Sequence, residues 1–208
     1  MTPTNDQQRE AMREGGKMLG RILNQVVASA KPGVSLHELD SLADTLLTQT
    51  GGEPGFKRVP GYRWATCINV NAGVVHGIPH PHLTLKQGDL VSLDTGLFYQ
   101  GFHTDTSTTV VVGKPSQEQQ HFLDTGKRAL SQGIAQAKPG KRIGHISQAM
   151  QKIIEAARFN CARHLTGHGI GQNLHQSPMI PCLLHGKLQV GLSPQKMVAP
   201  PDYSSTLF

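Results

Sequence analysis

A four-residue segment, Ala-Lys-Pro-Gly, occurs twice in this chain of 208 residues, at positions 30–33 and 137–140. Each copy lies between two amphipathic patterns of helical spacing, and each second pattern is followed by the tripeptide His-Gly-Ile, at 76–78 and at 168–170. One short match can arise by chance, but the same order of helix, tetrapeptide, helix and tripeptide indicates an internal duplication. The sequence therefore predicts an α+β fold of two pseudo-symmetric halves, in which helices cover curved antiparallel sheets.

The predicted helices have recognisable start signals and apolar faces. Ser35 followed by Glu38, and Ser116 followed by Gln119, form capping boxes, in which the side chains and backbone of the first turn satisfy each other's hydrogen bonds. Apolar residues recur with helical spacing and predict one buried face on each helix. They are Ala11, Gly15, Leu19, Ile22, Leu23, Val26 and Val27 in the first helix, Leu36, Leu39, Leu42, Leu46 and Leu47 in the second, and Ile143, Ile146, Met150, Ile153 and Ile154 in the last.

Strands are expected where each half reaches its His-Gly-Ile tripeptide, at residues 74–78 and 166–170. In the first half, residues 89–99 and 102–112 are separated by a Gln-Gly pair at 100–101. Two strand-like runs joined by a short glycine-containing turn predict a β-hairpin.

Composition excludes several classes of protein. The 20 Lys and Arg residues outnumber the 14 Asp and Glu residues, but they are scattered and not interleaved with aromatic residues, so no nucleic-acid-binding motif is present. No apolar run approaches the length of a membrane span and the start of the chain is too polar for a signal peptide, so we expect a cytoplasmic protein. The three cysteines form no Cys-x-x-Cys pair, which favours reduced thiols.

Asp94 and Asp105 are the strongest chemical signal. They lie symmetrically about a turn centred between Tyr99 and Gln100, which predicts that they face each other directly across the hairpin. Two such charges repel and raise a pKa, and the hairpin contains no Lys or Arg to balance them. A divalent cation bound by both carboxylates would balance their charges. The alternative is a hairpin whose aspartates both point into water.

Three of the eleven histidines stand out. His76 and His168 are each followed at once by glycine, which lets the backbone pass close to a ligand, and His175 lies shortly after the second of them. His168 could supply an imidazole ligand to a metal, whereas His76 and His175 could donate to a substrate carbonyl or amide. Spacing alone leaves a structural role open for each.

Five segments in order resemble the type I methionine aminopeptidases, and the resemblance runs from about Gln8 to Pro181. It implies the pita-bread fold and a two-metal hydrolase that removes the initiator methionine from nascent chains when the next residue is small. It also implies a cytoplasmic monomer whose partners are the N-terminal methionine of nascent peptides and the ribosome. The segments are 67–79, 85–94, 101–107, 112–115 and 167–175.

The resemblance assigns the metal ligands. Asp94 would bind one metal through both carboxylate oxygens, Asp105 would bridge both metals, and His168 would bind the second. Two divalent ions are implied, and ligands of this kind accommodate Co, Mn, Fe or Zn.

The resemblance also assigns the residues that meet the substrate. His76 would contact the region of the scissile bond, and His175 would donate a hydrogen bond to the peptide carbonyl as the tetrahedral intermediate forms. Tyr62 and Cys67 would form walls of the methionine pocket, where a thioether packs favourably.

The chain departs from the family at its C-terminal side. In the family, two glutamates beyond the second His-Gly-Ile complete the metal site, but here no Glu follows Glu155 and the one Asp is Asp202. Residues 182–208 lack clean alternation and contain three prolines, which interrupt strand pairing. We therefore expect an incomplete second half, doubtful metal occupancy and impaired activity.

These observations predict an aminopeptidase-like domain at residues 1–181, with halves of about 1–113 and 114–181, and a non-homologous tail at 182–208. Our hypothesis for the tail is an out-of-frame sequence. Two alternative functions remain: a catalytically inactive peptide-binding protein of the same fold, and a relative of prolidase. Segment 67–79 favours the methionine class.

Overall fold

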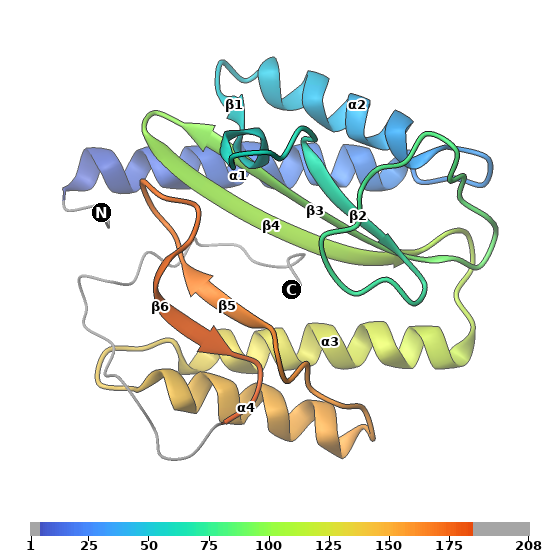
Figure 1. The fold of residues 1–208 in the computed structure, drawn as a ribbon. Coiled ribbons are helices and arrows are strands. Elements are labelled where there is room, and N and C mark those ends of the chain that lie inside the picture. Colours follow the sequence, from blue (N-terminus) through green and yellow to red (C-terminus); the bar gives the residue numbers. More distant parts are fainter. Residues whose placement is uncertain (1–4, 185–208) are drawn as a thin grey trace.

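The computed structural model describes residues 5–184, and Figure 1 shows the order of their elements along the chain. None of the described helices is long and apolar enough to cross a membrane. The elements are α1 (Asp6–Ala28), α2 (Leu36–Thr48), β1 (Glu53–Pro54), a short 3-10 helix (Gly55–Arg58), β2 (Thr66–Val70), β3 (Leu90–Tyr99), β4 (Phe102–Val111), α3 (Gln117–Gln136), α4 (Ile143–Ala156), β5 (Thr166–Gly169) and β6 (Gln176–Pro181).

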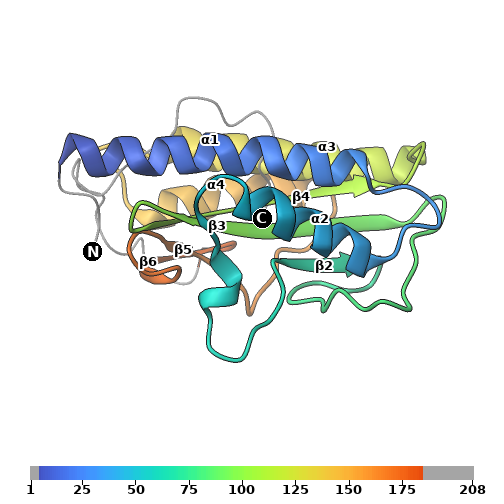
Figure 2. The same cartoon turned by 90° about the horizontal axis from the view of Figure 1, so that it is seen from above.

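The first half is an antiparallel sheet built around β3. Strands β1 and β2 pair with one edge of β3 and β4 pairs with the other. Helix α1 runs along the length of the sheet, and α2 lies beside it (Figure 2). The main core lies between these layers, because the buried leucines of α1 and α2 pack against Val91, Leu93 and Leu97 of β3.

The predicted capping boxes are confirmed. Ser35 Oγ accepts the amide of Glu38, and the Glu38 carboxylate accepts the amide of Ser35. Ser116 and Gln119 make the same reciprocal pair at the start of α3. The predicted apolar faces are confirmed as well, since every member is buried or packs against a buried cluster.

The second half repeats the order of two helices followed by strands. Helices α3 and α4 pack through Ala129, Ile143, Ile146 and Met150. The β5–β6 hairpin lies along this helix pair (Figure 1), with a β-bulge between His168 and Gly169. The predicted tail at 182–208 lies, from residue 185 onward, outside the described residues.

Residues 74–78 were expected to form a strand, and this expectation is wrong. They belong to a loop that leaves β2 at Asn71 and returns to it at Gly77, where the amide of Ile68 donates to the Gly77 carbonyl over 2.9 Å. Asn71 and His76 both adopt positive φ, at 53° and 55°. A left-handed residue cannot continue a pleated strand, so a valine-rich run becomes a loop here.

The β3–β4 hairpin is confirmed, but its register differs from the prediction. Gln100 and Gly101 both have positive φ, at 48° and 86°, and form a tight two-residue turn of the kind that suits the twist of a hairpin. Tyr99 therefore pairs with Phe102, and Asp94 lies opposite Ser107 instead of Asp105.

Candidate active site

Asp94 and Asp105 are diagonal neighbours on one face of the hairpin. Asp94 pairs with Ser107, and Asp105, two residues before Ser107, pairs with Gly96. The prediction of direct cross-strand pairing is thus wrong, but both side chains leave the same face because strand residues alternate with a period of two. Diagonal neighbours remain within reach of each other. The two carboxyl groups are close enough for the charge of Asp105 to raise the pKa of Asp94.

Burial governs the electrostatics of this pair. It raises the pKa of both carboxyl groups, and the charge of Asp105 raises that of Asp94 further. His168 acts in the opposite direction and lowers the pKa of Asp105. One oxygen of Asp105, Oδ1, is buried without a hydrogen-bond partner. The pair is therefore short of positive charge, which is the condition that a bound cation would relieve.

His168 completes this arrangement from the other half of the molecule. Its Nε2 lies 3.6 Å from Asp105 Oδ2, while its Nδ1 lies 3.0 Å from the carbonyl oxygen of Gly169. Because a carbonyl only accepts, this contact requires a proton on Nδ1, and it leaves Nε2 as the nitrogen that faces the carboxylate. An imidazole held in this way by its other nitrogen is the usual form of a metal-binding histidine.

The three side chains Asp94, Asp105 and His168 provide some of the ligands that a site for divalent ions needs. Asp105 lies between the other two donors, next to Asp94 on one side and His168 on the other. Within residues 5–184, no group of three His, Cys, Asp or Glu side chains closes around one point. The structure instead places two adjacent pairs, Asp94 with Asp105 and Asp105 with His168, which have Asp105 in common.

His175 lies beside His168 and near His76. The ring of His175 packs edge-on against that of His168, with centroids 4.4 Å apart. Partial burial lowers the pKa of His175, and the nearby rings of His168 and His76 lower it further. An imidazole that remains neutral can donate an N–H group to a substrate without adding charge.

Tyr62 and Cys67 face an apolar cluster at the junction of the two halves. Phe56, Cys67 and Leu174 are buried there, and Tyr62 and Ile170 pack against them. The Tyr62 hydroxyl donates to the Thr66 carbonyl over 2.7 Å and lies 3.1 Å from Cys67 Sγ. Cys67 also pairs across the sheet with Asp94, so the apolar cluster directly adjoins the carboxylates. Burial raises the pKa of the Cys67 thiol to about 11, which keeps it protonated.

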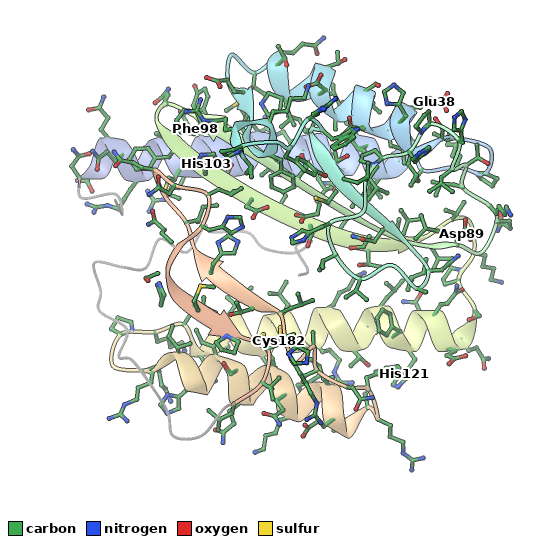
Figure 3. The ribbon with its side chains drawn as sticks, in the orientation of Figure 1. Glu38, Asp89, Phe98, His103, His121 and Cys182 are labelled. Atoms are coloured by element: carbon green, nitrogen blue, oxygen red, sulfur yellow. The ribbon has the colours of Figure 1, made fainter. Side chains whose placement is uncertain are left out.

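Sequence reasoning missed His103. It precedes Asp105 by two residues on β4, its ring packs against Phe98 at 4.7 Å between centroids (Figure 3), and its Nδ1 is buried without a partner. Burial lowers its pKa to about 4, with a further contribution from Arg58. The period of two along the strand, which places it on the face of Asp105, is the signal that could have found it.

Buried paired carboxylates, an oriented imidazole and two further histidines beside an apolar cluster define the site of a metal-dependent hydrolase. The model of metallopeptidase family M24 matches residues 10–198, and the chain belongs to this family.

Its relatives agree with this assignment. Methionine aminopeptidase 1 of Bacillus subtilis is 38% identical over 170 residues, which are 82% of this chain and 68% of that protein. The methionine aminopeptidase of Escherichia coli is 34% identical over 172 residues, or 82% and 65% of the two chains. The resemblance predicted from the five segments is confirmed.

Solved structures give the same result for the fold. The methionine aminopeptidase of Thermotoga maritima superimposes with a TM-score of 0.88 at 32% identity, over 93% of this chain and 78% of that one. Prolidase of Pyrococcus furiosus matches with a TM-score of 0.76 at 22% identity, over 90% and 54% of the two chains, which is a likeness of fold alone. The predicted α+β pita-bread fold is confirmed.

Proposed function

We propose that this chain is a methionine aminopeptidase, which hydrolyses the first peptide bond of chains that begin with methionine followed by a small residue. The observation that carries the proposal is the position of Asp105, next to Asp94 on one side and 3.6 Å from His168 on the other. The identity to methionine aminopeptidases and the adjoining apolar cluster support it.

In this proposal Asp94, Asp105 and His168 hold the metal, with Asp105 as the bridge. The chemistry that divalent ions such as Co, Mn, Fe or Zn supply is polarisation of the scissile carbonyl and activation of a water molecule. The family implies divalent metals, and two ions that share Asp105 are part of the proposal.

The substrate is held by the chain's own side chains. The methionine side chain enters the apolar cluster, where Tyr62 offers an aromatic face to its sulfur and Cys67 offers a neutral thiol. His175 and His76 donate N–H groups to the scissile amide and its carbonyl oxygen, where negative charge develops. His175 suits this role because its lowered pKa keeps the ring neutral near neutral pH.

We propose a lower metal occupancy and a slower reaction than a site with more carboxylate ligands would give. Two carboxylates and one imidazole are the donors of the described site, and no Glu follows Glu155 in the sequence. Fewer ligands weaken the hold on each ion, and among residues 5–184 the site offers no further carboxylate to move protons. Asp202 lies outside the described residues.

The organisation of the chain remains part of this proposal. Residues 1–181 form the catalytic domain, with halves of about 1–113 and 114–181, and residues 182–208 are an out-of-frame tail. Translation of the gene in all frames beyond the codon of Pro181 tests the tail hypothesis. A second frame that encodes acidic, strand-like segments would support it, and the lack of one would end it.

We propose that the enzyme acts as a cytoplasmic monomer on nascent peptides at the ribosome. The reason is chemical: an initiator methionine is present only at the start of a newly made chain. Sedimentation of the chain with and without ribosomes would test both the monomeric state and the contact.

The function is tested with purified chain, added Mn²⁺ or Co²⁺, and a Met-Ala-Ser peptide. Release of free methionine that stops when the metal is chelated supports the proposal. Peptide binding without any release would favour the inactive peptide-binding alternative. Cleavage of peptides with proline in second position, and not of Met-Ala-Ser, would favour a prolidase-like activity.

A further inference from the structure

The loop that carries His76 is exposed and makes few contacts of its own. Val74 and Val75 point into solvent, with 68% and 45% of their surface accessible. His76 itself adopts a left-handed backbone conformation, with φ of 55°. Such a conformation is strained for a residue with a side chain and persists only where its surroundings enforce it. Some neighbour must therefore hold His76 in place.

This neighbour is the end of β2, which holds His76 in place by binding the next residue, Gly77. The Ile68 amide donates to the Gly77 carbonyl over 2.9 Å, and the Gly77 amide donates to Asn69 Oδ1 over 3.0 Å. Gly77 is thus held on both its N–H and its C=O. The approach is so close that a Cβ added to Gly77 would lie 2.1 Å from the Ile68 oxygen, so only glycine fits.

Asn69 is buried inside this loop, with only 6% of its surface exposed. A Cβ at Gly73 would lie 3.3 Å from the Cβ of Asn69, and a Cβ at Gly77 would lie 2.8 Å from its Oδ1. The loop therefore wraps around the Asn69 side chain on its way from Asn71 back to Gly77. The backbone pairing of Asn69 with Ser92 anchors the side chain to the central strand of the sheet.

We propose that Asn69 is a positioning residue for His76. Its carboxamide oxygen binds the Gly77 N–H, and this bond sets the peptide plane between His76 and Gly77. The plane fixes the backbone of His76 and so directs its ring toward His175. The catalytic part of this inference rests on the proposed function, but the placement of the ring does not.

A purely structural role makes a different prediction. If the Asn69 oxygen does no more than satisfy a buried amide, its loss lowers stability without changing what the His76 ring experiences. Asn71 offers a matched control, because its Oδ1 also accepts one backbone amide, that of Leu90, over 2.9 Å. Its bonds tie the start of the loop to β3 and do not involve Gly77.

The test compares Asn69→Ala, Asn69→Asp and Asn71→Gly with the original chain. Aspartate keeps the acceptor oxygen, and glycine at 71 removes a side chain from a residue with φ of 53° without adding strain. NMR would follow the His76 ring signals and the exchange rate of the Gly77 amide. We expect Asn69→Ala to shift the ring signals and to speed exchange at Gly77 about 10-fold or more, since the amide loses its acceptor. Asn69→Asp should restore both, and Asn71→Gly should leave both unchanged.

The activity arm uses Met-Ala-Ser hydrolysis. We expect kcat to fall about 10- to 100-fold in Asn69→Ala with little change in KM, because a misplaced donor affects the transition state more than binding. Unchanged ring signals and Gly77 exchange in Asn69→Ala would overturn the inference, as would an equal effect of Asn71→Gly. Absence of hydrolysis by the original chain would refute the proposed function alone, and the NMR arm would still decide this inference.

Discussion

His168 Nε2 and Asp105 Oδ2 lie 3.6 Å apart, on elements from different halves of the chain. This distance is longer than a normal hydrogen bond. It is shorter than the ~4.2 Å that separates two ligands on opposite sides of one ion, if each lies ~2.1 Å from it. This distance suits two ligands of one ion, and in the proposed site the metal would join the two halves of the fold at this point.

Asp105→Asn should abolish methionine release and lower the metal content. Asparagine keeps the shape of the side chain but removes the charge that both ligand pairs share. We expect at least a 100-fold loss of kcat, comparable with removal of one key electrostatic contact. Turnover with Mn²⁺ and bound metal after dialysis provide the measurement. Near-normal turnover at saturating metal would contradict the role assigned to Asp105.

His175→Ala should reduce the rate and leave the metal content unchanged. Its ring packs edge-on against His168, and we assign it to the substrate instead of the ion. Loss of one donor to the developing negative charge costs about 100- to 1000-fold in kcat. Metal analysis of the same sample is the control, because a loss of metal would show that His175 helps to hold the ion.

Metal binding should release protons. Burial raises the pKa of Asp94 and Asp105, so the metal-free pair retains a proton that an ion must displace. Affinity should therefore fall as pH decreases. Calorimetric titration with Mn²⁺ in two buffers of different ionisation enthalpy at about pH 7 should show about one proton released per chain. Asp94→Asn removes the carboxyl group with the more strongly raised pKa, so release should drop toward zero; an unchanged value would contradict this assignment.

Asp40 should make stability depend on pH. It is 6% exposed and accepts two hydrogen bonds from Thr66, and burial raises its pKa above 3.8 despite these bonds. The folded state then keeps its proton to higher pH than the unfolded state. Stability from this group is present at low pH and is lost as pH rises from about 4 through the folded pKa. The free energy of unfolding relative to Asp40→Asn should therefore fall as pH rises above about 4.

Urea unfolding of both forms across this range measures the slope. Asp40→Ala is the second comparison, because it leaves the amide and hydroxyl of Thr66 without their acceptor and should cost about 1–3 kcal/mol. The opposite result is that the free energy of unfolding of the original chain rises with pH relative to that of Asp40→Asn. It would show that Asp40 is stabilised as an anion.

Local signals in the sequence predicted much of the fold. Ser35 and Ser116 start helices because a capping box involves only four consecutive residues, and the apolar faces follow from the helical period. The grouping of Asp94, Asp105 and His168 came from resemblance, since the last of these lies in the other half of the chain.

The two errors have different causes. The turn at Gln100 and Gly101 is where the sequence predicts it, but its centre lies between these two residues and not between Tyr99 and Gln100, which shifts the partner of Asp94 by two. The second error depends on a backbone conformation that residue type does not reveal, because His76 has a positive φ and turns an expected strand into a loop. Such conformations are uncommon for residues with side chains and are set by tertiary contacts.

The sheet treats the two carboxylates unequally. Asp94 lies on β3, which is paired on both edges, whereas Asp105 lies on β4, which among the described strands pairs with β3 alone. On its outer edge β4 meets the second half through the His103 amide, which donates to Gly171 over 2.7 Å. In the proposed site, the shared carboxylate would therefore come from the strand that is bonded to β3 on one edge and meets the second half of the fold on the other.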